Sequence, residues 1–421
     1  MSIQMILTAL TIAIVTFMFF SPRFPNAVTA TIGAIAVSLI GVVPFKSVFN
    51  SYAGTSIVLM CGMMVVGGGM FHTGFAGWLG NMIVKKTGKN ERGLQIAAIL
   101  GAAVLSTFCN GNAAVMILYP IFSSVCLAAH VSMSRIMLPM FIGINYGTFM
   151  SLAGSGMAPA TSSILMDAGY EGWSFFAPTT VGLPRAIISF VLMLLFMNKI
   201  LPDTFVLPDV AEAAKAKDLP EKLTGKMIVS GVIMVASVVG MVINSPVCPM
   251  HICAAIGAVA SVLTGCLSQK QMFASIDWGA VFMIGGMTAV ASGVAASGLG
   301  DVIANGVFAL GGGKASKFTI MMILLLTTGL ITQFMSNNSA ATLMAPIGIA
   351  VAESMGTDPH AFVMACLFGS GVAALTPMAT PVLAFIMEGG KYSAKDLFKM
   401  GLLSLISGII ASAIFIPLFW K

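Results

Sequence analysis

The sequence predicts an all-α polytopic membrane protein with two inverted repeats of five transmembrane helices, each repeat containing a re-entrant hairpin and a broken helix. Three observations predict this fold class. The chain of 421 residues is 58% hydrophobic and only 8% charged, whereas an ordinary soluble domain has about 25% charged residues. Apolar runs of about 18 residues or more recur along the chain. A polar interruption of such a run occurs twice, once in each half.

The two polar interruptions are similar to each other along their length. Residues 106–113 lead into Tyr119-Pro120-Ile121, and residues 332–339 lead into Ala345-Pro346-Ile347. Amides and hydroxyls at membrane depth are costly unless they bind something, and paired, broken apolar segments indicate a transporter with a site near the membrane midplane. Laid over each other without a gap, the segments pair Ser106 with Thr332, Phe108 with Phe334, Asn112 with Asn338, and Pro120 with Pro346.

The first half, residues 1–202, begins with an apolar run that resembles a signal peptide. It lacks a basic segment before the run and a small-residue cleavage site after it, so we expect a retained helix. Hydropathy then predicts the remaining elements in order. They are spans near 4–20, 26–44 and 55–72, a surface segment at 74–92, a hairpin at 94–130, a broken span at 134–165, and a full span at 177–200.

Residues 203–226 form the only long polar stretch and are predicted to be a cytoplasmic linker between the halves. The second half, residues 227–421, repeats the order of the first. Five spans is an odd number, so the second half must lie upside down in the membrane relative to the first. Its predicted elements are spans near 227–244, 249–267 and 278–296, a surface segment at 298–317, a hairpin at 317–355, a broken span at 358–387, and a final span at 397–420.

The basic residues predict the orientation of the chain. Placing both termini outside puts three quarters of the Lys and Arg residues on the cytoplasmic side of the inner (plasma) membrane, as the positive-inside rule requires. The hairpin at 94–130 then enters from the cytoplasm, and the hairpin at 317–355 enters from outside. The net charge of +6 is scattered over short loops, so the lipid bilayer is the expected surroundings and a nucleic-acid partner is not expected.

Each hairpin must reverse direction inside the bilayer, where non-helical backbone is tolerated only if it is buried in protein or lines a wet cavity. Asn110-Gly111-Asn112 and Ser336-Asn337-Asn338 supply the two turns. The second arm of each hairpin starts directly afterwards, and its helix N-terminus offers free N–H groups and a partial positive charge. The two tips are therefore predicted to bind an anion.

The broken spans are predicted to supply the other side of the site. Gly147-Thr148 and residues 153–159 cannot stay in a regular helix, and Pro377 and Pro381 each remove a backbone donor from the second span. Unwound carbonyls joined by hydroxyls suit a hard cation such as sodium. The alternative is that these segments are simple kinks whose polar residues bond a neighbouring helix. Their two-by-two match across the halves favours the site.

Three charged residues lie near the ends of predicted spans. Arg185 follows Pro184 and is a candidate anion ligand, but its position favours a side chain that extends to the membrane surface. Asp167 and Glu388 are expected to be solvated. No carboxylate falls in the middle of a predicted span, which argues against a carboxylate proton relay as the driving mechanism.

Over nearly its full length the chain resembles the divalent-anion:sodium symporter family, within the wider ion transporter superfamily. Residues 336–347 resemble the family's Ser-Asn-Thr hairpin signature, and Pro377-Met378-Ala379-Thr380-Pro381 resembles its Ala-Thr-Pro signature. The resemblance implies an elevator-type fold with scaffold and transport domains, and a homodimer formed through the scaffold. It implies sodium as coupling ion and no other cofactor.

Carried over position by position, the resemblance implies a substrate set and a sodium set. Three departures leave room for a shorter or differently charged anion: Asn338 stands where the family has Thr, the first tip reads Asn-Gly-Asn, and Gly156-Met157-Ala158 replaces Thr-Pro-Pro-Asn. The substrate set is Asn110, Gly111, Asn112, Ser336, Asn337, Asn338, Thr380 and Pro381. The sodium set is Ser106, Asn110, Ser155, Thr332, Asn337 and Ala379.

The expected function is therefore secondary active transport, in which a sodium gradient drives uptake of a small organic anion, a di- or tricarboxylate. The alternatives are a proton-coupled, exchange or efflux carrier of the same fold, similar to arsenite permeases, and a passive anion channel. An enzyme is not expected, because the sequence has no Ser/Lys or Ser/His pair and no His-Glu-x-x-His motif.

Overall fold

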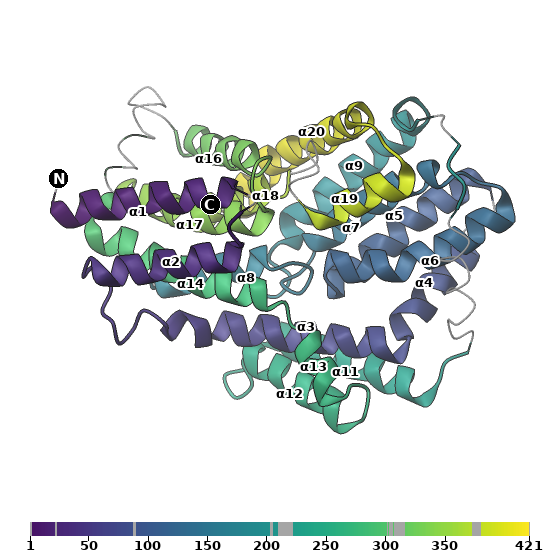
Figure 1. The fold of residues 1–421 in the computed structure, drawn as a ribbon, viewed down its shortest axis with the longest axis horizontal. Coiled ribbons are helices and arrows are strands. Elements are labelled where there is room, and N and C mark those ends of the chain that lie inside the picture. The colour runs from purple at the N-terminus through teal and green to yellow at the C-terminus, as the bar shows by residue number, and fades with distance from the viewer. Residues whose placement is uncertain are drawn as a thin grey trace.

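A computed structural model describes residues 2–21, 23–86, 90–202, 205–208, 222–300, 302, 306, 316–372 and 380–420. Every regular element in these ranges is a helix (Figure 1). Most of the predicted surface segment at 298–317 and most of the predicted linker at 203–226 lie outside the described residues, as does Ala379 of the predicted sodium set.

The helices follow the predicted order in both halves. The first half contains α1 (Ile3–Phe20), α2 (Asn26–Leu39), α3 (Thr55–Thr73), α4 (Phe75–Lys86), α5 (Glu91–Phe108), α6 (Gly111–Ala129), α7 (Met137–Thr148), α8 (Met157–Asp167) and α9 (Thr179–Ile200). The second contains α11 (Gly225–Ile243), α12 (Met250–Leu263), α13 (Gln269–Ala274), α14 (Trp278–Ser297), α16 (Lys317–Ile331), α17 (Asn337–Ser354), α18 (His360–Ser370), α19 (Pro381–Gly390) and α20 (Ala394–Phe419).

Seven of the described helices are long and apolar enough to cross a membrane, namely α1, α3, α6, α9, α11, α14 and α20. Six of these helices coincide with predicted spans, whereas α6 is the second arm of the predicted hairpin at 94–130. Since the sequence predicts ten spans, four of them are not single long helices. Two are broken into half-helices, as expected. The other two are α2 and α12, which have 14 residues each and so a length of about 21 Å, less than the roughly 30 Å of a hydrocarbon core. Both end shortly before a glycine in the left-handed region, Gly41 and Gly265.

The two halves pack against each other reciprocally. Helix α2 lies along α14, and α12 lies along α3 (Figure 1). Glycines permit both contacts, because a Cβ on Gly286 would lie 2.6 Å from the backbone of Ala30, and one on Gly62 would lie 2.7 Å from the backbone of Ala254. In each half, the second predicted span thus packs against the third predicted span of the other half.

Replacing Gly286 with valine should therefore destabilise the protein. The added side chain would overlap the backbone of Ala30, and overpacking of a buried contact costs about 1–3 kcal/mol or more. The midpoint of thermal unfolding of the purified protein measures this effect. Gly225→Val is the matched control, because nothing lies within 4 Å of a Cβ at Gly225. Equal midpoints for the two variants would contradict the close packing of α2 on α14.

The hairpin and the broken helix also occur twice with the same internal contacts. Helix α5 packs on α7 in the first half, and α16 packs on α18 in the second. The Ser106 hydroxyl donates to the Ile144 carbonyl, and the Thr332 hydroxyl donates to the Ser370 carbonyl, with 38 residues between donor and acceptor in both cases and a distance of 3.0 Å. The sequence similarity of the two halves therefore extends to their hydrogen bonds.

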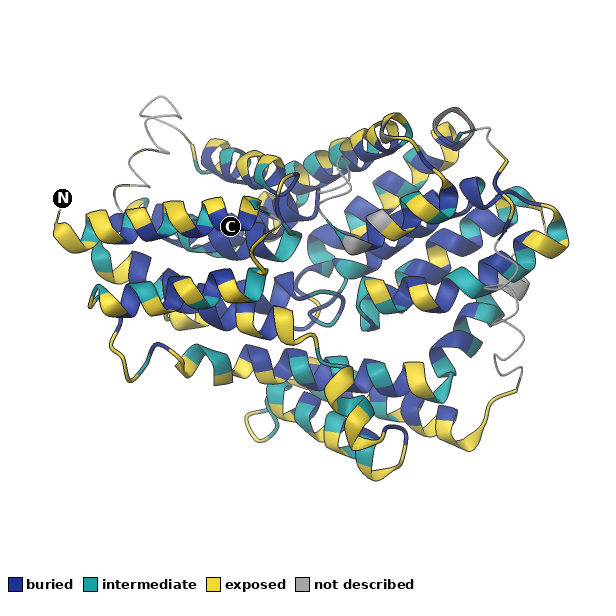
Figure 2. Ribbon diagram, viewed as in Figure 1, coloured by how far each residue is buried: buried dark blue, intermediate teal, exposed yellow. Residues whose placement is uncertain are grey.

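Burial separates central helices from peripheral ones. The apolar windows of α3 and α14 are 61% and 67% buried inside the protein, against 28% for α1 and 33% for α9, α11 and α20. Figure 2 shows exposed residues along the outer faces of α1, α11, α12 and α20, and mostly buried residues around α7, α8 and α18. Large apolar side chains on these outer faces, such as Ile3 and Leu263, suit contact with lipid. The first helix break, residues 149–156, contains only buried and partly buried residues.

Candidate functional site

A cavity of about 170 Å³ lies where the two hairpin tips meet the first helix break and the start of α19. The first tip connects α5 to α6, and the second connects α16 to α17. The breaks lie between α7 and α8 and before α19. The predicted residues that border this cavity are Asn110, Gly111, Asn112, Ser155, Ser336, Asn337, Asn338 and Thr380, and Thr148, Gly154 and Gly156 of the first break border it too.

The first tip is shaped by a helix cap. The side-chain oxygen of Asn110 accepts from the backbone N–H of Asn112 at 2.8 Å and from that of Ala113 at 3.2 Å. This ends the turn and starts α6 at Gly111, as asparagine does at N-caps. Gly111 is tightly enclosed, because a Cβ there would lie 2.7 Å from the Ile144 side chain. The N-terminus of α6 therefore lies at the cavity.

The second tip is built in the same way. The Ser336 hydroxyl caps α17 by accepting from the backbone N–H of Ser339 at 3.1 Å, and it accepts from the Asn26 side chain at 3.2 Å. Asn337 accepts from the Thr332 hydroxyl at 3.0 Å. The Asn338 side chain reaches across to the first break, since a Cβ on Gly156 would lie 3.3 Å from its Nδ2. The residues of the two halves thus meet across the cavity.

The first break brings backbone carbonyls together around Gly154. A Cβ there would lie 2.8 Å from the carbonyl oxygen of Ser106 and 2.9 Å from those of Gly147 and Thr148. The neighbouring Ser155 hydroxyl is buried and has no hydrogen-bond partner among the described protein atoms. This group of oxygens is a suitable environment for a small hard cation, which takes oxygen ligands.

The second break is described from Thr380 onward. Thr380 caps α19, its hydroxyl accepting from the backbone N–H of Leu383 at 3.1 Å, and α19 begins at Pro381. A third helix N-terminus therefore lies beside the cavity. Proline at this position is consistent with a helix start, because the first N–H of a helix has no partner within the helix.

Two members of the predicted sodium set, Ser106 and Thr332, lie behind the residues that line the cavity. Ser106 is fully buried and does not border the cavity, because its hydroxyl donates to the carbonyls of Ala102 and Ile144. Its own carbonyl, near Gly154, is the atom that lies close to the break. Thr332 is also fully buried, and its hydroxyl connects Asn337 to the Ser370 carbonyl.

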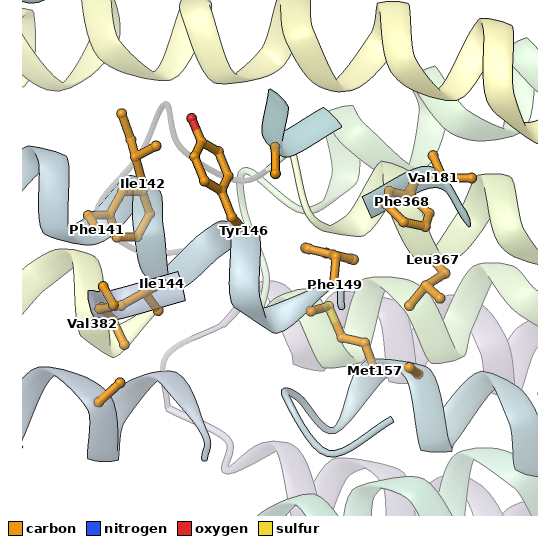
Figure 3. Packing of buried hydrophobic residues seen from close by; sticks show 14 of the residues in the cluster. Phe141, Ile142, Ile144, Tyr146, Phe149, Met157, Val181, Leu367, Phe368 and Val382 are labelled. Carbon is orange, nitrogen blue, oxygen red and sulfur yellow. The ribbon is translucent and has the colours of Figure 1, made fainter. Parts of the chain in front are cut away.

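The cavity has one apolar wall. Figure 3 shows Ile144 close to Val382, and Phe149 close to Met157. All four border the cavity. The Phe149 ring lies against Phe368 of α18, with ring centroids 5.0 Å apart. A ligand would therefore contact polar groups at its ends and apolar groups along its length.

Three residues of this region belong to neither the predicted substrate set nor the predicted sodium set. Asp277 is a charged residue that borders the cavity, and its carboxylate caps α14 by accepting from the Ala280 N–H at 3.0 Å. Asn145 of α7 borders the cavity although it lies inside a predicted span without a turn signal. Arg185 lies directly behind Asn145, and its Nη2 donates to the Asn145 Oδ1 at 2.8 Å. The prediction that Arg185 extends to the membrane surface is wrong, because the side chain is 2% exposed.

The remaining charged residues near span ends lie at the surface. Asp167 and Glu388 are exposed, as expected, and Asp167 accepts a hydrogen bond from Ser51 at 3.2 Å. The described part of the chain has no group of three or more His, Cys, Asp or Glu side chains that could hold a metal ion. Any cation in the cavity would therefore be held mainly by carbonyl, amide and hydroxyl oxygens.

Several apolar helices surround a small cavity that both hairpin tips, the first helix break and the start of α19 border. These features are typical of a multi-pass membrane transport protein. The chain belongs to the citrate transporter family, CitMHS, which it matches over residues 9–307 and 247–421. Members of this family are transporters, so the protein is not an enzyme.

Named relatives agree with this assignment. The uncharacterized transporter YfbS of Escherichia coli (strain K12) is 30% identical over 200 residues, 47% of this chain and 32% of that protein. The sodium-dependent dicarboxylate transporter SdcS of Staphylococcus aureus (strain USA300) is 24% identical over 443 residues, 96% of this chain and 83% of that protein. The match thus spans about a third of the first relative and most of the second. The resemblance to sodium-coupled anion symporters is confirmed.

A solved structure has a similar fold. The YdaH transporter of Alcanivorax borkumensis, whose crystal structure is described as revealing an unusual topology, matches with a TM-score of 0.56 over 91% of this chain and 87% of that chain. The two sequences are 15% identical, so the likeness concerns the fold alone.

Proposed function

We propose that the protein uses a sodium gradient to drive uptake of a small organic anion, a di- or tricarboxylate. The observation that carries this proposal is that both hairpin tips, the first helix break and the start of α19 border one cavity. The family description as citrate transporters and the dicarboxylate transport in the name of SdcS support a carboxylate substrate.

The anion would bind at the helix N-termini that lie at the cavity. Helices α6, α17 and α19 begin there, behind the caps Asn110, Ser336 and Thr380. Helix N-termini carry free N–H groups and a partial positive charge. The volume of about 170 Å³ is below the roughly 300 Å³ of pockets for drug-sized ligands, which favours a small substrate. Gly111, Asn112, Asn337, Asn338 and Pro381 complete the proposed substrate set.

Sodium would bind at two places related by the repeat. The first is the group of carbonyls around Gly154, with Ser155 and Asn110 beside it. The second is formed by Thr332, Asn337 and the Ser370 carbonyl, to which the family signature adds Ala379. Both offer neutral oxygen ligands, so an ion bound there adds a positive charge next to the anion, and binding of the two should be mutually dependent.

The same proposal includes the arrangement in the membrane. Residues 1–202 and 227–421 are the two inverted repeats, joined by the cytoplasmic linker 203–226, with both termini outside the inner membrane. The hairpins and broken helices would move as a transport domain in an elevator motion against a scaffold. The scaffold would form the homodimer. The exposed apolar faces of α11 and α12 are available for lipid or for a second copy.

Uptake into proteoliposomes tests this function. Purified protein is reconstituted, and uptake of radiolabelled citrate and succinate is measured with an inward sodium gradient, an inward proton gradient, or neither. The proposal predicts accumulation with the sodium gradient, which is lost when a sodium ionophore collapses that gradient. Accumulation driven by protons alone, or by outward exchange alone, would favour the alternative carriers. Equilibration without any gradient would favour a channel.

Asp277 distinguishes sodium coupling from proton coupling, because it is a carboxylate at the cavity. Asn at this position keeps the side-chain oxygen that caps α14, so Asp277→Asn should fold normally. We expect sodium-driven uptake to remain within about twofold of that of the unsubstituted protein. The substitution removes no hydrogen bond, and the loss of one would cost about 1 kcal/mol. The initial uptake rate tests this expectation. A folded Asp277→Asn variant without uptake would indicate a proton-coupled carrier.

A further inference from the structure

A buried arginine lies behind the wall of the cavity. Arg185 of α9 is 2% exposed, and its Nη2 donates to the Asn145 side-chain oxygen at 2.8 Å, to the Gly371 carbonyl at 3.0 Å and to the Ser404 hydroxyl at 3.4 Å. Its Nε and Nη1 have no hydrogen-bond partner in the described protein. The guanidinium is therefore enclosed by protein but incompletely bonded.

No carboxylate of the described residues pairs with Arg185. The ion pairs that the structure shows involve Arg135 and His360 instead. Two neighbouring groups offset only part of the positive charge of the guanidinium. They are the Gly371 carbonyl at the C-terminal end of α18 and the Phe149 ring, whose centroid lies 5.0 Å from the arginine Cζ. Helix C-termini and aromatic faces attract cations weakly compared with a carboxylate. A buried charge without a counter-ion is costly, so this one requires an explanation.

The position of Arg185 relates it to both halves. Asn145 follows Ile144, and Gly371 follows Ser370. Ile144 and Ser370 are the carbonyl acceptors of the equivalent hydrogen bonds from the two hairpins. Arg185 thus bonds to equivalent positions in both broken helices, and it lies one residue behind the cavity lining, in contact with Asn145.

The hydrogen bond from Arg185 fixes the orientation of the Asn145 amide. An arginine can only donate, so the atom of Asn145 that faces it must be the oxygen. The remaining polar group of Asn145 is its NH₂, which is a donor. Asn145 is 8% exposed and borders the cavity. The available NH₂ is therefore a hydrogen-bond donor on the cavity wall, and a full positive charge lies directly behind it.

We propose that Asn145 and Arg185 form an anion subsite, which makes the cavity select a fully ionised oxyanion over a less charged analogue. Asn145 donates its side-chain NH₂ to a carboxylate oxygen of the substrate. Arg185 acts as a positioning residue, which orients Asn145 and supplies the charge that the substrate balances. This inference rests on the proposed function, because it requires an anionic substrate.

Asn145→Asp is the decisive substitution. Aspartate has nearly the shape of asparagine, accepts from Arg185 in the same place and supplies the missing counter-ion. If the pair has only a structural role, the variant should fold at least as well and bind anions unchanged. If the pair binds the substrate, the variant should fold but bind the anion weakly. Its side chain has no NH₂ donor, it neutralises the arginine, and it places a carboxylate at the cavity wall.

The experiment measures binding of citrate, succinate and succinamate, the monoamide of succinate, to the purified protein in sodium by calorimetry. We expect the unsubstituted protein to bind succinate more tightly than succinamate. We expect Asn145→Asp to lose about 10- to 100-fold in succinate affinity, as for loss of hydrogen bonds to a charged group. Its midpoint of thermal unfolding without ligand should be equal or higher, and its stabilisation by sodium alone should be retained.

Two further variants test whether an altered affinity comes from the pair itself or from a general effect of substitution. Arg185→Gln should lose the preference for succinate over succinamate, and Ser404→Ala, which removes only the 3.4 Å contact, should bind like the unsubstituted protein. An Asn145→Asp variant that binds succinate with unchanged affinity overturns the subsite and leaves the proposed function intact. An unsubstituted protein that binds neither citrate nor succinate overturns the proposed function and the subsite with it.

Discussion

Gly154→Ala is expected to raise strongly the sodium concentration that sodium-stimulated uptake requires. A Cβ at this position would lie 2.8–2.9 Å from three carbonyl oxygens, which is closer than real Cβ atoms approach such atoms. The carbonyls would have to move apart, and they are the proposed ligands of the first sodium ion. Overpacking costs about 1–3 kcal/mol. If this cost raises the free energy of the sodium-bound state alone, sodium affinity falls by up to about 100-fold.

The sodium concentration that gives half-maximal uptake in proteoliposomes measures this prediction. Gly101→Ala is the matched control, because Gly101 is a buried glycine of α5 whose added Cβ would make only ordinary contacts at 3.7 and 3.8 Å. The control should transport with unchanged sodium dependence. Unchanged sodium dependence in Gly154→Ala as well would mean that the carbonyls around Gly154 do not hold the coupling ion.

The second large effect is expected for the asparagines at the tips. Asn338 approaches the first break from the second hairpin, and Asn112 follows the cap of the first. Replacing either with alanine removes a hydrogen bond to a charged ligand, worth about 1.5–3 kcal/mol. Uptake at low substrate concentration should therefore fall about 10- to 100-fold for each variant.

The control for the tips is Asn50→Ala, an exposed asparagine in the loop before α3. All three variants should be expressed and should elute as the unsubstituted protein does. If both tip variants transport at the normal rate, the substrate set is wrong, and the polar tips serve only to turn the hairpins. If only one of them loses uptake, the site is formed mainly by one half.

Much of the fold was predictable because its signals are local. A long apolar run predicts a span wherever it occurs, and the polar turns at 110–112 and 336–338 predict that a helix starts there. The two helices, α6 and α17, begin inside these turns, at Gly111 and Asn337. The repeat was visible because the hairpin tips occur twice with similar residues. The lengths of α2 and α12 were not predictable from hydropathy, since the apolar character continues beyond the glycine-containing turns that end them.

The parts of the site that escaped prediction depend on tertiary packing. Arg185 lies near the end of a predicted span, which favours an exposed side chain. The packing of α20 on α9 encloses it instead. Asn145 has no signal of its own, because its role follows from the arginine that α9 brings to it.

The most direct test of the central claim, that one cavity binds sodium and a carboxylate together, is calorimetric titration of citrate and succinate in sodium chloride and in choline chloride. We predict tight binding of at least one of them in sodium, and affinity at least about 10-fold weaker in choline, corresponding to a coupling free energy of about 1.4 kcal/mol or more. Equal affinity in the two salts would contradict sodium coupling at this site.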